Sequence, residues 1–328
     1  MKTNVVVRIY QHSSDIPAEV SGNNLFHSKE LFTICERTSG YKPLLFVAWR
    51  NERPIGKLLG IIRKSVRNFP PSIIKRCEVY GTGEYATGEH EESLFKLLLD
   101  ELTRTALNQC FLIEFRNLSN PLFAYKHFRE NGYFPINWLR IHNSLHSKSP
   151  MKRMSPSRRR QIKRALADGV SIHIAQTHEE IQQFFHLIKK YYASKVRKHL
   201  PDVHFFLQML DEFPGKEVGR IFLVKYKEKL IGGSICVFSE NNAYLWFSAG
   251  LRKSYSKQYP GVLAVWAVLN YASKHKYDHV EFMDVGLPFK QYGYRNFILR
   301  FGGIQYGTRR WFHFRWKWLN HLVTRFYI

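Results

Sequence analysis

Alternating apolar and polar positions in the first half of the chain predict a series of strands and amphipathic helices. Two apolar runs, 44–49 and 55–62, flank a polar turn at 50–54, and this pattern is typical of a β-hairpin. Further strands are predicted at 77–80 and 111–115. Between these two strands, apolar residues recur at the spacing of one helix face, namely Leu94, Leu97, Leu98 and Leu102.

The second half repeats this order of hairpin, strand, helix and strand. The repeated elements are predicted at 222–238, at 242–249, at 262–274 and from residue 278 onward. Phe46 and Phe222 coincide when the chain is shifted by 176 positions. Internal similarity of this kind indicates two duplicated domains, which we predict at 1–150 and 151–328. The fold class is therefore α/β, with a mixed sheet in each domain.

Two helices near the start of the second domain carry start signals. Ser155 suits an N-cap and Pro156 the first helical position. Thr177 and Glu180 have the spacing of a capping box for the following helix. The basic cluster at 158–164 is either a phosphate-contacting face or an ordinary solvated helix surface. Beyond residue 309 we expect a closing strand at 311–316 and a tail.

Charge is distributed unevenly along the 328 residues. The formal net charge is +24, while 45% of the residues are hydrophobic, enough for packed cores. Residues 1–150 hold 20 Lys and Arg against 14 Asp and Glu, whereas residues 151–328 hold 30 against 12. The second half should therefore attract a polyanion such as RNA, an anionic membrane surface or a phosphorylated substrate. The alternative is that like charge only keeps the protein in solution.

Cysteine spacing and hydropathy bear on location. The four cysteines form no CxxC pair, which favours a reducing compartment and no metal site. The N-terminal apolar run is too short for a signal peptide, and no apolar run reaches the length of a membrane span. We therefore expect a cytoplasmic protein, with peripheral contact at the inner face of an anionic membrane as a further option.

The stretch 278–303 is the strongest candidate for a functional site. It begins as a short apolar strand, breaks at Gly286 and Pro288, and continues into a basic and aromatic loop. A buried strand that ends in such a loop is a common way to build a site on an α/β scaffold. The alternative is a surface loop whose aromatic side chains cover the edge of the sheet.

Three segments of the second half carry a family resemblance. They are MSPSRRRQIKRA at 154–165, PGVLAVW at 260–266, and DVG at 284–286 followed by FILRFG at 297–302. Together with the repeated order, they resemble tandem GNAT acyltransferase domains of the Fem type, the peptidoglycan-bridge aminoacyl transferases. The resemblance implies transfer of an acetyl or aminoacyl group to an amine, with acetyl-CoA or aminoacyl-tRNA as donor and no metal.

One departure from the family pattern concerns the reaction itself. Ile298 stands where the F-K-x-x-F-G segment of the Fem family has lysine, which is thought to stabilise charge during transfer. Isoleucine cannot do this. Either Lys290 or Arg300 supplies the charge from a neighbouring position, or the chemistry differs.

The chemistry of acyl transfer to an amine suggests roles for further residues. A base must take the amine proton, and donors must stabilise the oxyanion. In GNAT-like sites backbone N–H groups of the central strand, expected here at 244–249, do much of the second task. The expected catalytic residues are Lys290, Arg300 and Asp284. The expected substrate-binding residues are Tyr292, Tyr294, Arg295, Trp246, Ser248, Glu84, Tyr85, Arg197 and Lys198.

Neither half contains a clean glycine-rich pyrophosphate loop. The loop at 81–89 is flexible but acidic, whereas the loop at 252–259 is cationic. If a pyrophosphate binds, we expect it at the second loop, on Arg252, Lys253 and Lys257.

The function expected from these residues is N-acylation of an amine, on a small-molecule or lipid-linked cell-envelope precursor or a sugar nucleotide. A rival from another class is a non-catalytic protein that binds RNA or a membrane surface and keeps the GNAT fold. Ile298 and the missing glycine loop favour this rival, and the clustered aromatic residues at 289–301 speak against it. A third possibility is an ordinary acetyl-CoA N-acetyltransferase with an atypical pyrophosphate loop.

Overall fold

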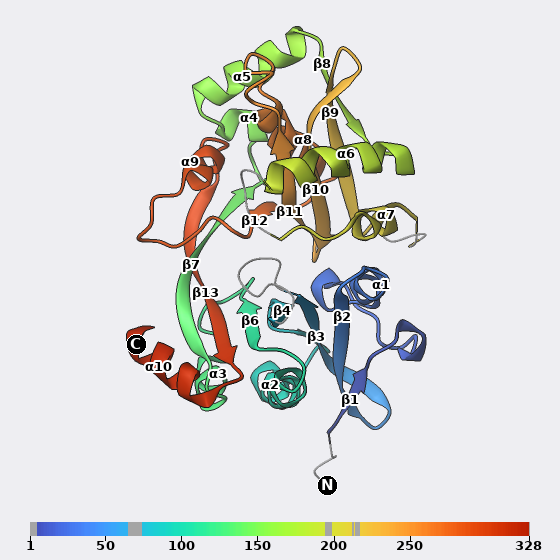
Figure 1. Ribbon diagram of the computed structural model, residues 1–328, viewed down its shortest axis with the longest axis vertical. Helices are drawn as coiled ribbons and strands as arrows, with labels where there is room; N and C mark the ends of the chain where they lie inside the picture. The colour runs from blue at the N-terminus through green and yellow to red at the C-terminus, as the bar shows by residue number, and fades with distance from the viewer. Residues whose placement is uncertain (1–4, 65–73, 194–198, 212, 214–216, 328) are drawn as a thin grey trace. The chain divides into compact units, whose positions relative to one another are not determined.

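The chain forms two compact units in the computed structural model, which describes residues 5–64, 74–193, 199–211, 213 and 217–327. Unit 1 comprises Met1–Trp138 and Gly307–Ile328, and unit 2 comprises Leu139–Tyr306. Each unit is a mixed α/β structure (Figure 1). The C-terminal segment from Gly307 thus belongs to the first unit. The predicted domains, divided at residue 150, had placed this segment in the second.

Unit 1 is built on a sheet with the strand order β1-β2-β3-β4-β6-β13. Its neighbouring strands are antiparallel, except that β4 and β6 run parallel. The strands are β1 (Val6–Tyr10), β2 (Tyr41–Arg50), β3 (Arg53–Lys64), β4 (Lys75–Tyr80), β5 (Glu84–Tyr85), β6 (Leu112–Arg116) and β13 (Ile304–Phe314). The short strand β5 pairs with β3 outside this order.

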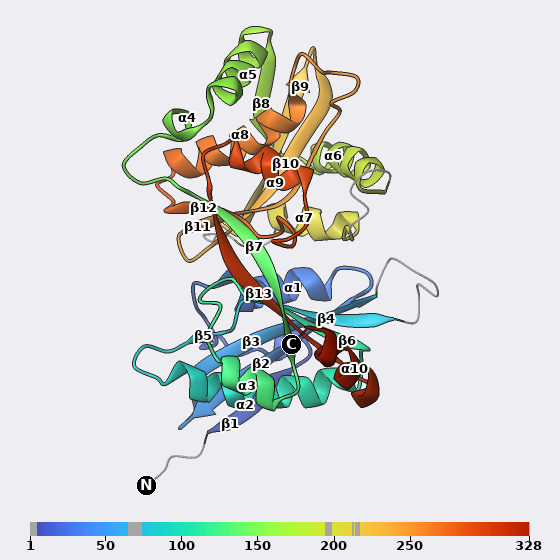
Figure 2. The same ribbon diagram turned by 90° about the vertical axis from the view of Figure 1, so that its left-hand side faces the viewer.

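Helices cover both faces of the sheet in unit 1. Figure 2 shows α1 and α2 on opposite sides of the strands. The helices are α1 (Lys29–Glu36), α2 (Glu91–Leu107), α3 (Tyr125–Glu130) and α10 (Lys317–Tyr327), with 3-10 turns η1 (Ser13–Asp15) and η2 (Leu25–His27). One core joins the leucines of α2 to β2, β3 and β6 and to the buried indole of Trp311. Leu97 is the exception on α2, because it is exposed.

Unit 2 repeats this plan with the strand order β7-β12-β11-β10-β9-β8. Here too the neighbours are antiparallel, apart from the parallel pair β11 and β12. The strands are β7 (Phe134–Ser144), β8 (Val170–Ile174), β9 (Gly219–Tyr226), β10 (Lys229–Ser239), β11 (Asn242–Gly250) and β12 (His279–Phe282). The predicted repeat of hairpin, strand, helix and strand is confirmed, and in both units the last strand runs parallel to the one before the helix.

The helices of unit 2 lie on two sides of its sheet, with α8 on one side and α6 and α7 on the other (Figure 2). The helices are α4 (Pro150–Arg153), α5 (Pro156–Ala167), α6 (His178–Tyr191), α7 (Val203–Asp211), α8 (Pro260–Lys274) and α9 (Gly293–Leu299). The predicted caps are present, since the hydroxyls of Ser155 and Thr177 accept hydrogen bonds from the N–H groups of Arg158 and Glu180. The core on the α8 side includes Ile298 and Phe301.

The structure contains several elements that the sequence pattern did not predict, among them the strands β7 and β8. Helix α7 occupies residues for which no element was predicted. Helix α9 lies inside the stretch 286–303 that was expected to be a loop. The closing strand is longer than predicted and is followed by α10 rather than by a tail. Helices α7 and α10 have apolar residues at helical spacing, so the sequence does contain a signal for them, whereas α9 is only seven residues long and gives a weak one.

Several further observations bear on chemistry. In the part of the chain that the structure describes, no helix is long and apolar enough to cross a bilayer. The same residues contain no group of three or more His, Cys, Asp or Glu that could hold a metal ion. All four cysteines are free thiols and are buried.

Candidate functional site

The sheet of unit 2 opens between its two parallel strands. β11 pairs with β12 only from Asn242 to Tyr244, and β12 ends at Phe282 while β11 continues to Gly250. Among the described residues, no parallel partner is recorded for the second half of β11. Backbone N–H groups on this half that point away from β10 therefore have no residue of β12 opposite them, and a ligand carbonyl oxygen could take the place of a strand there.

A β-bulge lies in the same half of β11. Ile235 on β10 pairs with Phe247 and Cys236 pairs with Leu245, so that Trp246 is the extra residue. The bulge changes the direction of the side chains. The rings of Trp246 and Phe247 stack at 5.8 Å, and they contact Phe205 and Phe206 of α7 respectively. Strict alternation along the strand would put Trp246 and Phe247 on opposite faces, and the bulge is the reason that their rings lie together.

Two phenol groups meet β11 at Ser248. Tyr192, directly after α6, hydrogen-bonds to the backbone of Ser248, and Tyr294 of α9 hydrogen-bonds to its side chain. Burial raises the pKa of both phenols, and the half-buried carboxylate of Asp284 raises each pKa further. Each phenol therefore holds its proton more tightly than a free tyrosine does, although its hydrogen bond with Ser248 opposes this effect in part.

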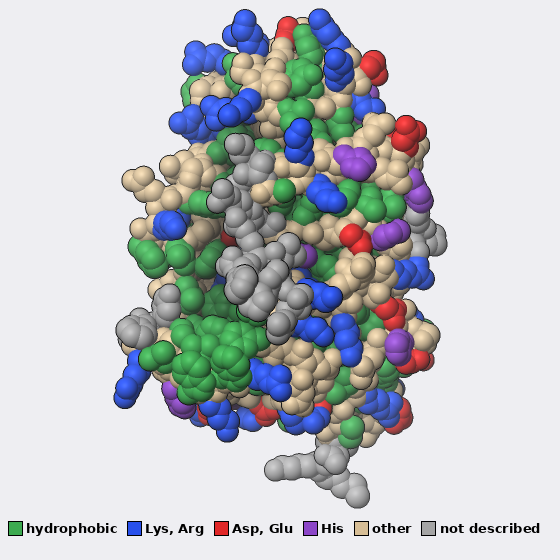
Figure 3. Space-filling view, viewed as in Figure 1, with side chains coloured by type: hydrophobic (Ala, Val, Ile, Leu, Met, Phe, Trp, Pro, Cys, Tyr) green, Lys and Arg blue, Asp and Glu red, His purple; other side chains and the backbone are tan. Residues whose placement is uncertain are grey.

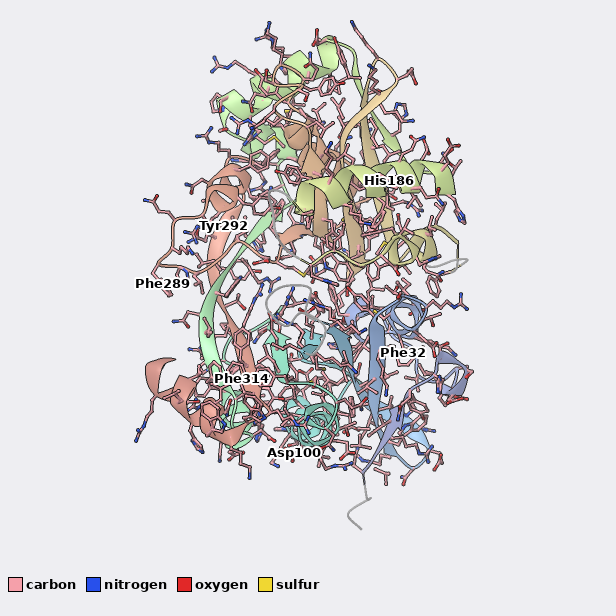
Figure 4. All side chains as sticks on the ribbon, viewed as in Figure 1. Phe32, Asp100, His186, Phe289, Tyr292 and Phe314 are labelled. Carbon is pink, nitrogen blue, oxygen red and sulfur yellow. The ribbon has the colours of Figure 1, made fainter. Side chains whose placement is uncertain are left out.

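The loop between β12 and α9 has a fixed shape. Gly286 has φ +88°, and an added Cβ would lie 3.1 Å from the ring of Tyr292. The guanidinium of Arg295, which is buried, donates to the carbonyls of Leu287 at 2.8 Å and Lys290 at 2.6 Å. These bonds tie α9 to the loop that precedes it and set the position from which Tyr294 reaches Ser248. Figure 4 labels Tyr292 beside α9 and Phe289 at the outer edge of this loop.

The second half of β11 leads into the N-terminus of α8. A Cβ on Gly250 would lie 2.5 Å from the backbone nitrogen of Gly261, so glycine lets the strand end contact the helix start. Space beside Gly261 itself is open. The intervening loop carries three exposed cations, Arg252, Lys253 and Lys257. An anionic group could bind here, because the helix dipole and the side chains both favour negative charge.

Comparison with known proteins identifies this part of the chain. Residues 153–291 match the family model described as an acetyltransferase (GNAT) domain. Unit 2 is thus similar to a GNAT domain over most of its length. The comparison with curated proteins gave no match.

Solved structures show how far the fold likeness extends. The crystal structure of FemX is similar over 98% of this chain and 99% of its own, with a TM-score of 0.65 and 11% identity. A tandem GNAT protein from the clavulanic acid biosynthesis pathway is similar over 95% of this chain and 99% of its own, with a TM-score of 0.55 and 12% identity. The C-terminal domain of a putative lysylphosphatidylglycerol synthetase from Agrobacterium fabrum is similar over 93% of this chain and 92% of its own, with a TM-score of 0.59 and 9% identity. The chain thus has a tandem GNAT-like fold of the kind seen in FemX.

The structure places several predicted site residues at the opening of the GNAT-like domain. Tyr294 hydrogen-bonds to Ser248 of β11, and the charge of Asp284 acts on the same phenol. Tyr292 also contributes to the electrostatic surroundings of Tyr294. Arg295, predicted to bind substrate, instead uses its guanidinium to hold the loop before α9. Lys290 and Arg300, predicted as catalytic, have exposed side chains on either side of α9.

Other predicted residues lie elsewhere. Glu84 and Tyr85 are in unit 1, where the Glu84 carboxylate pairs with the Lys57 ammonium at 3.1 Å and the Tyr85 hydroxyl donates to the Thr82 carbonyl at 2.5 Å. These contacts give both side chains a structural role there. Arg197 and Lys198 lie outside the described residues.

The basic helix α5 is only partly a solvated surface. Arg158 is buried, with its guanidinium over the rings of Phe297 at 4.5 Å and Phe301 at 4.6 Å. Burial, together with the nearby charge of Arg300, lowers the pKa of Arg158 to about 10. Arg158 therefore anchors α9 to α5. Of the other cations of the cluster, Arg159 is half-buried, and Arg160, Lys163 and Arg164 have exposed side chains.

The corresponding place in unit 1 is closed. β4 and β6 pair along their length, from Arg76 to Tyr80 and from Leu112 to Arg116. Two buried carboxylates link the strands here: the Glu78 carboxylate accepts from Arg63 and Arg116, and the Glu114 carboxylate accepts from Arg76, Arg116 and Arg310. This ion network crosses from strand to strand, so β4 and β6 lack the opening seen at β11.

Tyr192 is a site residue that is absent from the predicted set, because its position at the end of the apolar face of α6 indicates a core residue. Its ring is indeed buried, and it contacts Phe247. Its hydroxyl, however, reaches the backbone of Ser248. A tyrosine at the end of an otherwise apolar helix face is the available signal, because a phenol placed in a core needs a hydrogen-bonding partner.

Proposed function

We propose that this protein is an N-acyltransferase whose reaction takes place at the opening between β11 and β12. The observation that carries this proposal is the meeting of β11 backbone that β12 does not pair, two phenols and the Asp284 carboxylate at one point of a GNAT-like domain. Such a site offers oxyanion donors, a proton donor and a base, the groups that acyl transfer to an amine requires.

In the proposed reaction, the nitrogen of an amine attacks the carbonyl carbon of an acyl donor. The carbonyl oxygen becomes an oxyanion that N–H groups of β11 stabilise. Asp284 accepts the proton that the amine loses. The bond between the carbonyl carbon and the leaving group then breaks, and Tyr294 gives its proton to the leaving group as the amide forms.

An acyl-CoA is the donor that the site favours. Its pyrophosphate would lie at the N-terminus of α8, near Arg252, Lys253 and Lys257. Lys290 and Arg300, with their exposed side chains, would contact anionic groups of the substrates rather than the reacting carbonyl. Acyl-CoA is a cytoplasmic molecule, and four free buried thiols suit a reducing compartment.

Aminoacyl-tRNA is the second candidate donor. The fold likeness to FemX and to a domain of a protein named as a lysylphosphatidylglycerol synthetase supports it. So does the excess of cations in the second half of the chain, because a tRNA carries many phosphates. For either donor we propose an amine on a cell-envelope precursor, lipid-linked or nucleotide-linked, as acceptor.

The first experiment is a thermal-shift titration with acetyl-CoA, free coenzyme A and charged tRNA in parallel. A ligand that binds the native state raises the melting temperature as its concentration passes its Kd. We expect a saturable shift with acetyl-CoA, followed by release of coenzyme A thiol when an amine acceptor is added. No shift with acetyl-CoA or charged tRNA would refute the proposal.

A substitution tests the role of the phenol. Tyr294→Phe keeps the ring and removes the proton donor, so kcat should fall by roughly 10²–10⁴-fold with little change in the Kd for the donor. Tyr226→Phe, on β9 of the same unit, is the matched control and should retain activity. Full activity in Tyr294→Phe would exclude this tyrosine as the acid.

A further inference from the structure

Helix α10 presents an apolar ridge that the core of unit 1 does not cover. Trp316 and Trp318 are 52% and 63% exposed, and Leu322 is 47% exposed. Figure 3 shows hydrophobic side chains gathered in the region of α10, at the lower left of the view. Single exposed apolar residues are ordinary on a protein surface, but a cluster of a tryptophan and a leucine on α10 with the tryptophan directly before it indicates an interaction site.

The helix is anchored firmly by its opposite side. The side chain of Asn320 accepts from the Phe314 N–H at 3.1 Å and donates to the Gly132 carbonyl at 2.6 Å. Trp316, at the start of the ridge, also packs edge-on against Phe111 at 5.1 Å, so the ridge itself is attached to unit 1 at this end. The exposed ridge is therefore held in a fixed orientation on unit 1 and is not the consequence of a loosely attached end.

A stripe of cations runs beside the ridge. Lys317, His321 and Arg325 are exposed and follow each other at intervals of four residues, so they share one face of the helix. Trp318 and Leu322 form the adjacent stripe with the same spacing. The stretch 304–328 contains five Lys and Arg residues and no Asp or Glu. An apolar stripe bordered by cations alone is the arrangement of helices that lie in the surface of an anionic bilayer.

We propose that α10 docks on an anionic lipid surface, with Trp316, Trp318 and Leu322 entering the interface and Lys317 and Arg325 contacting lipid phosphates. Indole rings suit this environment, because they combine a large apolar body with one polar N–H. The geometry disfavours single-stranded RNA as the occupant: the two indoles already stack on each other at 6.0 Å, and Leu322 offers no ring for a base. This inference does not depend on the proposed acyl transfer.

The test is co-sedimentation of the whole protein with phosphatidylcholine vesicles, with and without phosphatidylglycerol. We expect binding that requires the anionic lipid. The double variant Trp318→Ser, Leu322→Ser should weaken the partition coefficient by about tenfold or more. Removing the charge of Lys317 or Arg325 by substitution with Gln should weaken it by roughly fivefold each.

Leu166→Ser is the matched control. Leu166 is 43% exposed on α5, beside the exposed cations Lys163 and Arg164, so this variant removes a similar apolar surface from another basic helix. It should bind vesicles as the parent protein does. Unchanged melting temperatures in the α10 variants would exclude unfolding as the cause of lost binding.

Three results would overturn the proposal. The first is binding to anionic vesicles that the α10 variants do not alter. The second is a protein that binds no vesicles but dimerises, with a dimer that Trp318→Ser, Leu322→Ser disrupts. The third is binding to RNA, but not to vesicles, that the same variants weaken.

Discussion

Restoring the lysine of the Fem segment at position 298 tests how the site of this protein is built. Ile298 is fully buried in the core of unit 2. In Ile298→Lys the ammonium group would enter that core rather than the opening at β11. We therefore expect a destabilised protein, not a more active one.

The magnitude follows from the cost of keeping a buried lysine neutral. A free lysine has a pKa of about 10.4, so its deprotonation at pH 7 costs about 4.5 kcal/mol. Losing the branched shape of isoleucine adds about 1 kcal/mol. Because the pKa of the buried amine is lowered in the folded state, the unfolded state binds the extra proton and stability rises with pH. Between pH 7 and pH 9 the penalty should shrink by about 2.7 kcal/mol.

Urea unfolding at the two pH values measures this difference. Ile298→Met is the control, because methionine has an unbranched side chain of similar length without the charge, and it should cost less than about 1.5 kcal/mol at both pH values. The informative quantity is the difference between the Lys and Met variants, which cancels the pH dependence that they share.

A small and pH-independent difference between Ile298→Lys and Ile298→Met would refute this reasoning. The ammonium would then reach solvent or the opening, and position 298 could carry the charge that the Fem family places there. Gain of acyl transfer in the Lys variant would support the same conclusion.

Two further predictions concern buried polar groups of unit 1. Burial and the charge of Lys57 lower the pKa of His27 to about 3, so below pH 6.5 only the unfolded state gains a proton. The free energy of unfolding should therefore fall by about 2 kcal/mol from pH 7 to pH 5. Urea melts of His27→Gln should lack this loss, whereas the exposed control His186→Gln should retain it. Arg63→Met leaves the buried Glu78 carboxylate with one partner fewer and should cost about 3–5 kcal/mol of stability in the same assay. The control Arg104→Met breaks an exposed pair with Glu101 and should cost no more than about 1 kcal/mol. Equal losses in the two variants would contradict the argument that burial makes the Arg63–Glu78 pair more important for stability.

The repeated plan of the two units could be predicted because it depends on local signals. Three hairpins turn on pairs of residues with positive φ, such as Asn51 with Glu52 and Lys227 with Glu228. These short polar turns lie between apolar runs, and that is a pattern visible in a single sequence. Ser155 and Thr177 mark helix starts for the same reason, since a cap needs only its own side chain and a neighbouring N–H.

The site could be predicted only in part, because its parts are distant in the sequence. The stretch after β12 was recognisable, and it supplies Asp284 and Tyr294. The bulge at Trp246 left no signal, since it depends on how β10 and β11 pair. Arg295 was predicted to bind substrate, but its guanidinium donates to two backbone carbonyls of the loop before α9. These carbonyls come together only in the folded loop, so the sequence could not indicate this role.

The two units show that topology alone does not make an acyl-transfer site. Both have a strand, a helix and a parallel strand in the same order. In unit 1 the parallel pair is complete, and Glu78 and Glu114 join the strands to surrounding arginines. In unit 2 the pairing stops after Tyr244, and phenol hydroxyls rather than ion pairs meet the strand. A carbonyl substrate needs unpaired backbone donors, which a complete ladder cannot offer. The difference in pairing, not in fold, is therefore the reason to place the reaction in unit 2.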